Sequence, residues 1–98
     1  MTPEADLKDK IRFHIISIGG YCFKPVQMGM GEATVDILAC VRGRFVAIEA
    51  KAPGKYKDPW VGCTPRQRRT LTAVSNAGGF SFATDDIDDT KRILGALL

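Results

Sequence analysis

The sequence predicts one α/β domain, residues 1–98, in which helices cover both faces of a mixed β-sheet. Three observations carry this prediction. Apolar residues recur at helical spacing near the N-terminus, two β-rich runs flank a short Arg-Gly pair, and a helix-start signal precedes a further β-rich run and a second amphipathic segment. The expected order is α-β-β-β-α-β-α.

The first element is an amphipathic helix over residues 4–17, ended by Gly19 and Gly20. Its apolar stripe consists of Leu7, Ile11, Ile15 and Ile18. Glu4 lies on the same stripe. It either faces the sheet, where a cation or hydrogen bonds would have to offset its burial, or it simply favours the positive end of the helix dipole.

Three β-rich segments follow. Residues 21–23 form a short strand limited by Pro25, and the segment 28–31 is a glycine-rich loop. The next two runs, 34–41 and 44–51, surround Arg42-Gly43, which predicts a hairpin.

The second half of the chain begins with an exposed loop over 53–63. Thr64 as N-cap and Pro65 then start a helix that ends before Gly78, and 80–84 is a strand. The last helix follows Asp85-Asp86, with Ile87, Thr90, Leu94 and Leu97 on one face. The strand 44–51, this middle helix and the strand 80–84 form the expected right-handed β-α-β crossover.

Composition excludes several classes of protein. No apolar run is long enough to span a membrane, and the first residues lack the features of a signal peptide, so a cytoplasmic protein is expected. The three cysteines suggest neither a disulfide framework nor a zinc site, and each is interpreted as a small buried hydrophobe. The net charge is +3.

The positive charge is concentrated between residues 42 and 69. Two acids, Glu49 and Asp58, stand there against eight basic residues: Arg42, Arg44, Lys51, Lys55, Lys57, Arg66, Arg68 and Arg69. Such a segment either holds a polyanion or is a solvated surface. Tyr56 and Trp60 in the loop either stack on an unpaired base or pack the loop against the domain.

The hairpin places acidic residues together. A two-residue loop at Arg42-Gly43 sets Asp36 opposite Glu49, and Lys51 points to the same face. Like charges in opposed positions call for a divalent cation, and oxygen ligands, to which the Ala50 carbonyl could add, suit Mg²⁺ or Mn²⁺. The competing interpretation is an ordinary solvated sheet face, and a bulge at the loop would turn the two acids to opposite faces.

These residues resemble the PD-(D/E)xK nuclease superfamily and, more narrowly, the virus-type replication-repair nuclease (VRR-NUC) domain, over nearly the whole chain. The resemblance rests on Glu4 in the first helix, Lys24 after the first strand, Asp36, the run Glu49-Ala50-Lys51, and Thr64-Pro65-Arg66-Gln67 at the start of the middle helix. It departs from the family at Ala33-Thr34-Val35-Asp36, where members usually have Gly-x-Pro-Asp.

The resemblance implies a restriction-endonuclease-like αβββαβ core with an additional C-terminal helix. It also implies a Mg²⁺- or Mn²⁺-dependent endonuclease that acts on branched DNA, such as Holliday junctions or flaps, as a homodimer of the phage type. Asp36, Glu49, Lys51, Gln67 and Glu4 are then the catalytic residues, and Asp36, Glu49, Glu4 and the Ala50 carbonyl are the metal ligands. DNA contacts are expected from Lys24, Arg42, Arg44, Lys55, Lys57, Arg66, Arg68 and Arg69.

Two other hypotheses remain open. The chain is alternatively a catalytically inactive nuclease-fold module that binds DNA, although intact Asp36, Glu49 and Lys51 favour the enzyme. A basic interaction domain with no nucleic-acid role would explain the charge but would leave Glu4, Gln67 and the acid pair without a purpose.

Overall fold

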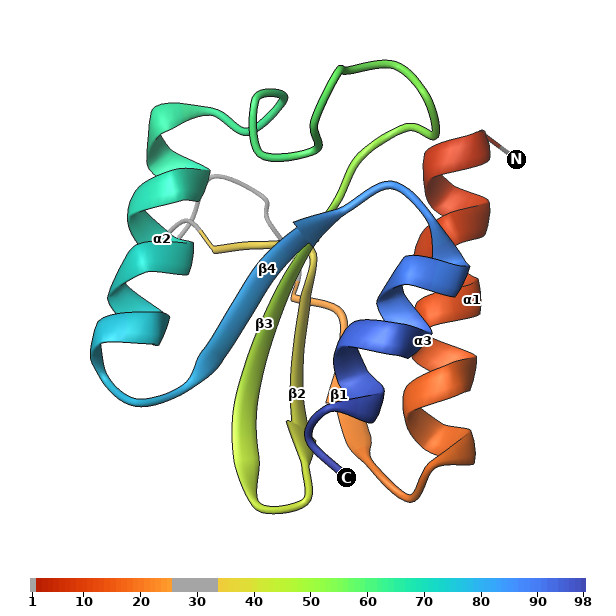
Figure 1. Cartoon of the computed structure of the whole chain (residues 1–98), viewed down its shortest axis with the longest axis vertical. Helices are drawn as coiled ribbons and strands as arrows, with labels where there is room; N and C mark the ends of the chain where they lie inside the picture. The colour runs from red at the N-terminus through yellow and green to blue at the C-terminus, as the bar shows by residue number, and fades with distance from the viewer. Residues whose placement is uncertain (1, 26–33) are drawn as a thin grey trace.

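The computed structural model describes residues 2–25 and 34–98, which form three helices and four strands in the expected order (Figure 1). The elements are α1 (Pro3–Ser17), β1 (Tyr21–Phe23), β2 (Ile37–Val41), β3 (Arg44–Ala50), α2 (Pro65–Asn76), β4 (Phe80–Thr84) and α3 (Ile87–Gly95). Within the described ranges, no helix has the length and apolar character needed to cross a membrane.

The four strands form one mixed sheet in the order β1-β2-β3-β4. The pairs β1/β2 and β2/β3 are antiparallel, and β3/β4 is parallel because α2 connects these two strands. Arg42 and Gly43 have φ values of 52° and 77°, and Val41 pairs with Arg44. Positive φ at both loop residues is the geometry of a type I′ turn, which matches the twist of the strands. The expected two-residue hairpin is therefore confirmed.

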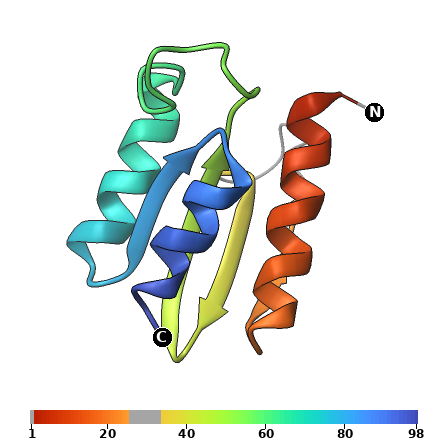
Figure 2. The same cartoon turned by 45° about the vertical axis from the view of Figure 1, so that its right-hand side comes forward.

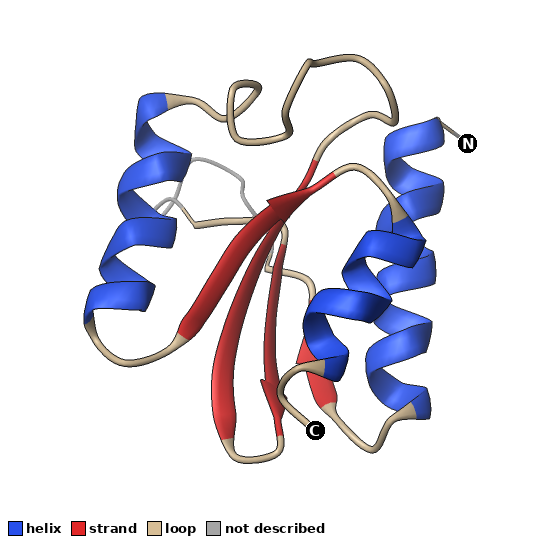
Figure 3. Ribbon diagram, in the orientation of Figure 1, coloured by secondary structure: helices blue, strands red, loops and turns tan. Residues whose placement is uncertain are grey.

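Helices cover both faces of the sheet, as the sequence predicts (Figures 2 and 3). On one face α1 and α3 pack against the sheet through apolar residues that include Leu7, Ile11, Ile15, Ile37, Val46, Ile48 and Leu94. On the other face α2 packs through Leu71 against a smaller cluster of Val35, Ala47 and Cys63. Because side chains alternate along a strand, neighbouring β3 residues enter the two different cores.

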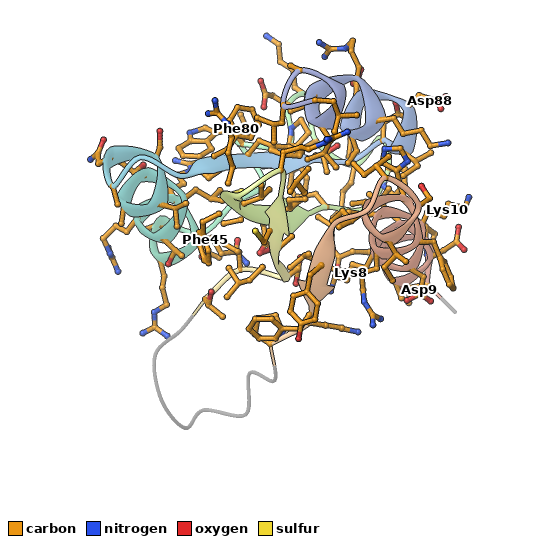
Figure 4. All side chains as sticks on the ribbon, turned by 90° about the horizontal axis from the view of Figure 1, so that it is seen from below. Lys8, Asp9, Lys10, Phe45, Phe80 and Asp88 are labelled. Atoms are coloured by element: carbon orange, nitrogen blue, oxygen red, sulfur yellow. The ribbon has the colours of Figure 1, made fainter. Side chains whose placement is uncertain are left out.

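Two expectations differ from the structure. The second strand begins at Ile37 rather than at residue 34, so Asp36 lies just before β2. The expected glycine-rich loop at 28–31 lies outside the described residues. Cys63 is buried, but Cys40 is exposed, so the expectation that every cysteine is buried is wrong. Cys40 lies between Tyr21 of β1 and Phe45 of β3, in a row that is exposed on the face of α2 (Figure 4 labels Phe45).

Candidate active site

The hairpin brings Asp36 and Glu49 together at one end of the sheet. The last pair of the β2/β3 ladder is Ile37 with Ile48, so these two acids follow directly in the same register. The Oδ2 atom of Asp36 accepts a hydrogen bond of 3.0 Å from the backbone N–H of Ala50. This contact fixes the carboxylate beside β3 although Asp36 itself lies before the strand.

Glu49 is buried, with an exposed fraction of 2%. Burial raises its pKa to about 8, and the hydrogen bond to Asp36 and that residue's charge add to the increase, while Lys51 and Lys8 oppose it. Its Oε2 atom accepts a hydrogen bond of 3.2 Å from Nε2 of Gln67. Its Oε1 atom is buried and accepts no hydrogen bond from the described residues. In the protein without a bound cation, a proton on Glu49 relieves the repulsion between the carboxyl groups of Asp36 and Glu49.

Gln67 reaches the acids because of its position in the first turn of α2. Thr64 and Gln67 form a capping box: the Thr64 Oγ1 atom accepts from the Gln67 N–H at 3.1 Å, and the Gln67 Oε1 atom accepts from the Thr64 N–H at 2.9 Å. The same Oε1 atom accepts from Nζ of Lys51 at 3.0 Å. The amide of Gln67 therefore holds Glu49 and Lys51 at the same time.

Lys51 follows the last residue of β3. Its backbone N–H donates to the carbonyl of Thr84 at 2.9 Å, which continues the parallel pairing one residue beyond the strand. The Nζ atom lies 3.7 Å from Oε2 of Glu49. An ammonium group has three N–H donors, so one remains available for a phosphate oxygen or a water molecule after the contacts to Gln67 and Glu49.

Lys8 of α1 is a site residue that the sequence analysis missed. Its Nζ atom lies 3.1 Å from Oδ1 of Asp36 and 3.7 Å from Oε2 of Glu4. Burial alone would lower the pKa of Lys8, but the hydrogen bond and charge of Asp36 outweigh it, with help from Glu4 and Glu49, and the pKa is raised. The spacing of Glu4 and Lys8, one helical turn apart at the sheet-facing start of the helix, was the signal available in the sequence.

Glu4 takes a less direct position than the sequence predicts. The contact that connects it to the acid pair runs through Lys8. Within residues 2–25 and 34–98, no group of three or more His, Cys, Asp or Glu side chains gathers in a way that could hold a metal ion. In this structure Glu4 is therefore a neighbour of the pair rather than its third member.

The basic residues predicted to contact DNA lie in three parts of the structure. Lys55, Lys57, Arg66, Arg68 and Arg69 lie in the loop after β3 and in the first turns of α2, at the end of the sheet where the acids meet (Figure 1). Arg42 and Arg44 lie at the β2/β3 turn, and Arg44 is five residues before Glu49, or about 17 Å along the strand. Lys24 directly follows β1 and is exposed.

Most of these cations are free of carboxylates. Among the described residues, the ion pairs join acids to Lys8, Lys10, Arg12, Lys51 and Arg92. The exposed side chains of Lys57, Arg66 and Arg69 are thus available to a polyanion. Arg68 is directed inward, because its guanidinium donates to the carbonyls of Trp60 and Val61 at 3.2 and 3.1 Å.

The loop between β3 and α2 is packed by its own aromatic residues. The Arg68 guanidinium lies 5.7 Å from the centre of the Trp60 ring, and the Tyr56 ring lies so close to Gly62 that a Cβ there would overlap it. The N–H of Gly54 donates to Asp85 at 3.2 Å. The interpretation that Tyr56 and Trp60 pack the loop is supported, although Trp60 keeps 40% of its surface exposed.

The oxygen atoms available as ligands at this end of the sheet fit a hard divalent cation. Asp36, just before β2, and Glu49, in β3, supply carboxylate oxygens. The buried Oε1 atom of Glu49 lacks a hydrogen-bond donor among the described residues. A bound cation would also replace the proton that the raised pKa of Glu49 implies. Carboxylates without cysteine or histidine suit Mg²⁺ or Mn²⁺ better than Zn²⁺.

Comparison with known proteins identifies the architecture. No family model and no curated protein matches the sequence. A solved structure described as a "VRR_NUC domain" superimposes with a TM-score of 0.78 at 19% identity, covering 100% of both chains. The fold is that of a VRR_NUC domain.

The VRR_NUC fold confirms the expected fold class, including the mixed four-stranded sheet between helices. The structure also places the predicted Asp36, Glu49, Lys51 and Gln67 in one connected group. At 19% identity the likeness concerns the architecture.

Proposed function

We propose that the chain is a Mg²⁺- or Mn²⁺-dependent deoxyribonuclease that hydrolyses phosphodiester bonds. The observation that carries the proposal is the buried Glu49, whose Oε1 atom has no hydrogen-bond donor in the described structure, while its Oε2 atom lies 3.7 Å from Nζ of Lys51. A buried polar atom left in this way is costly unless something binds it. A divalent cation held by Asp36, Glu49 and the backbone carbonyl of Ala50 would satisfy that atom.

The side chains divide the work of hydrolysis. A divalent cation held here would supply Lewis acidity, which would polarise a phosphoryl oxygen and ease ionisation of the attacking water. The Lys51 ammonium stabilises negative charge that develops on the phosphate, using the N–H that its contacts to Gln67 and Glu49 leave available. Gln67 orients both Glu49 and Lys51, so it is a positioning residue.

DNA binding relies on the cations around this end of the sheet. Lys57, Arg66 and Arg69 are exposed and form no ion pair among the described residues, so each can contact a phosphate. Because they lie in the loop after Lys51 and in the first turns of α2, a strand bound to them would pass beside the acid pair. Lys24, which follows β1 at the same end of the sheet as Asp36, would add to this contact, and Arg42 and Arg44 would extend it along the sheet.

The resemblance to stand-alone VRR-NUC domains supports branched DNA, such as a Holliday junction or a flap, as the substrate of a homodimer. Two active sites related by a two-fold axis would cut two strands. The exposed side chains of Phe13, Tyr21 and Phe45 give this small domain apolar surface that a second copy could cover. Light scattering should then give a mass near twice the 10.7 kDa of the chain, and a monomer at micromolar concentration would contradict the paired cut.

The decisive experiment compares cleavage of labelled DNA by the wild type and by two lysine variants. Four-way junction, 5′-flap and plain duplex substrates are incubated with Mg²⁺, with Mn²⁺ or with EDTA. Lys51→Ala removes the ammonium beside Glu49, whereas Lys57→Ala removes an exposed lysine of the adjoining loop. We expect cation-dependent cutting that is lost in Lys51→Ala and retained in Lys57→Ala at saturating protein.

The acid pair is tested in the same assay. Glu49→Ala should abolish cleavage and leave DNA binding in EDTA largely intact, because the cations that hold the phosphates lie on other elements. Full activity in this variant would remove the proposed site. Binding of DNA by the wild type without any cutting, in either cation, would favour the non-catalytic DNA-binding module.

A further inference from the structure

We infer that Lys8 is a built-in cation that occupies Asp36 while no metal is bound and that must leave this carboxylate when a divalent cation enters. The inference rests on the proposed metal site and concerns how that site is regulated. It makes Lys8 a determinant of metal affinity, so the concentration of Mg²⁺ or Mn²⁺ needed for activity depends on an α1 side chain outside the set of catalytic residues.

The two oxygens of Asp36 have different partners. Oδ2 accepts the Ala50 N–H at 3.0 Å, a contact that attaches the residue to β3. Oδ1 lies 3.1 Å from the Lys8 Nζ atom, which is hydrogen-bonding distance. A cation bridging Asp36 and Glu49 would use the oxygen that does not hold the backbone, and this is the oxygen at which Lys8 lies.

The ammonium and a divalent cation cannot share this oxygen without a penalty. A divalent cation that also used Oδ1 would be a close neighbour of the Lys8 ammonium in a half-buried place, where repulsion is weakly screened. The side chain of Lys8 is 17% exposed and that of Asp36 is 15% exposed. Displacement of Lys8 from Asp36 removes this repulsion.

Glu4 supplies a place for the displaced ammonium. Its Oε2 atom lies 3.7 Å from Lys8 Nζ, one helical turn away on α1, and its side chain is 40% exposed. A small rotation of the lysine side chain would exchange the half-buried Asp36 for this more solvated carboxylate. Glu4 therefore acts on the metal indirectly, by accepting Lys8, rather than as a ligand.

The same helix offers a matched control in Lys10. Its Nζ atom lies 3.0 Å from Asp6, also one turn away, but the lysine side chain is 57% exposed. Figure 4 shows Lys8 on the side of α1 nearer the sheet and Lys10 on the outer side. Substitution of Lys10 thus removes a similar ion pair and the same charge without changing any contact of Asp36 or Glu49.

The test measures Mn²⁺ affinity by isothermal titration calorimetry on EDTA-treated, dialysed protein, with no DNA and no cleavage. Lys8→Met keeps the aliphatic stem and removes the charge. We expect it to bind Mn²⁺ about tenfold more tightly than the wild type, as the loss of a charge-assisted hydrogen bond that competes with the metal implies. Lys10→Met should match the wild type, and circular dichroism checks that each variant is folded.

The outcomes separate this inference from the proposed function. Equal or weaker Mn²⁺ binding by folded Lys8→Met, with a wild type that binds, overturns the role of Lys8 and leaves the metal site standing. If neither the wild type nor Lys8→Met binds Mn²⁺, and Asp36→Asn leaves the titration unchanged, both the metal site and the role of Lys8 are overturned. Tighter Mn²⁺ binding in both Lys8→Met and Lys10→Met overturns the role of Lys8, because the effect would then come from the lower net charge.

A double-mutant cycle tests the role of Glu4. If Glu4 accepts the displaced ammonium, Glu4→Gln weakens Mn²⁺ binding in the wild type and has no effect in the Lys8→Met background. If Glu4 is a metal ligand, Glu4→Gln weakens binding equally in both backgrounds. The second result would overturn the transfer of Lys8 to Glu4.

Discussion

Removing the carboxylate of Glu49 should stabilise the metal-free protein at high pH while it destroys the proposed activity. The substitution is Glu49→Gln, which keeps the shape of the side chain and cannot ionise. In the fold the pKa of Glu49 is about 8 against an ordinary value of 4.5, chiefly because of burial and then because of Asp36. The folded state thus holds a proton that the unfolded chain releases at much lower pH.

The sign of the effect follows from this proton. The contribution of Glu49 to stability is fully present below pH 4.5, where Glu49 is protonated in both states, and it falls as pH rises until Glu49 ionises in the fold near pH 8. At about 1.36 kcal/mol for each pH unit in this interval, the loss between pH 5 and pH 8 is on the order of 3 to 4 kcal/mol. For a domain of this size that lowers Tm by about 15 °C.

The assay is thermal unfolding of EDTA-treated wild type and Glu49→Gln, followed by circular dichroism between pH 5 and pH 8. Titrating groups remote from Glu49, such as His14, whose pKa is lowered by burial and by Lys91, contribute equally to both proteins. The difference between the two curves therefore isolates Glu49 and its interactions with Asp36, Lys51 and Lys8. Parallel curves would refute the reasoning, since they would mean that Glu49 is already ionised in the folded state at pH 5.

Three further measurements follow from the contacts described above. Gln67→Ala should lower kcat about 10- to 100-fold because it releases Glu49 and Lys51. Thr64→Ala weakens only the helix cap, so it should lower stability by about 1 kcal/mol and change kcat little. Equal kcat values in the two variants would contradict the positioning role of Gln67. Arg69→Gln should reduce the slope of log K against log salt for DNA binding by about 1, and a smaller change is expected for Arg42→Asn at the far end of the sheet. The latter variant should also raise stability by about 0.5 kcal/mol, because Asn tolerates the positive φ of the turn better than Arg, and denaturant unfolding would show it.

Much of the fold could be predicted because its local signals agree. The α1 stripe, the Arg42-Gly43 turn and the Thr64 cap each specify an element, and the structure contains all three. The register of the hairpin then determined that Asp36 meets Glu49, since a two-residue turn leaves no freedom in the pairing. Gln67 was predicted as a site residue from the resemblance to the VRR-NUC domain, and its place in the first turn of α2 brings its amide to Glu49 and Lys51.

The remainder depends on tertiary geometry that the sequence does not reveal. The spacing of Glu4 and Lys8 indicates an ion pair along the helix, but only the packing of α1 against the sheet brings the Lys8 ammonium to Asp36. Glu4 lies on the apolar stripe, yet at the start of the helix it reaches Lys8 rather than joining the acids. The burial of Cys40 was predicted wrongly because α2 covers the sheet only in part, and the extent of that cover is not encoded in strand periodicity.

The exposure of Cys40 gives the molecule an intrinsic chemical reporter. Its thiol is open to solvent between Tyr21 and Phe45, whereas Cys63 is buried and Cys22 is half-buried, with its sulfur 3.9 Å from the Arg12 carbonyl. Alkylation should therefore modify Cys40 first. Its rate, followed by mass spectrometry as the protein is diluted, will rise if a second copy leaves this face and stay constant if the face is open throughout.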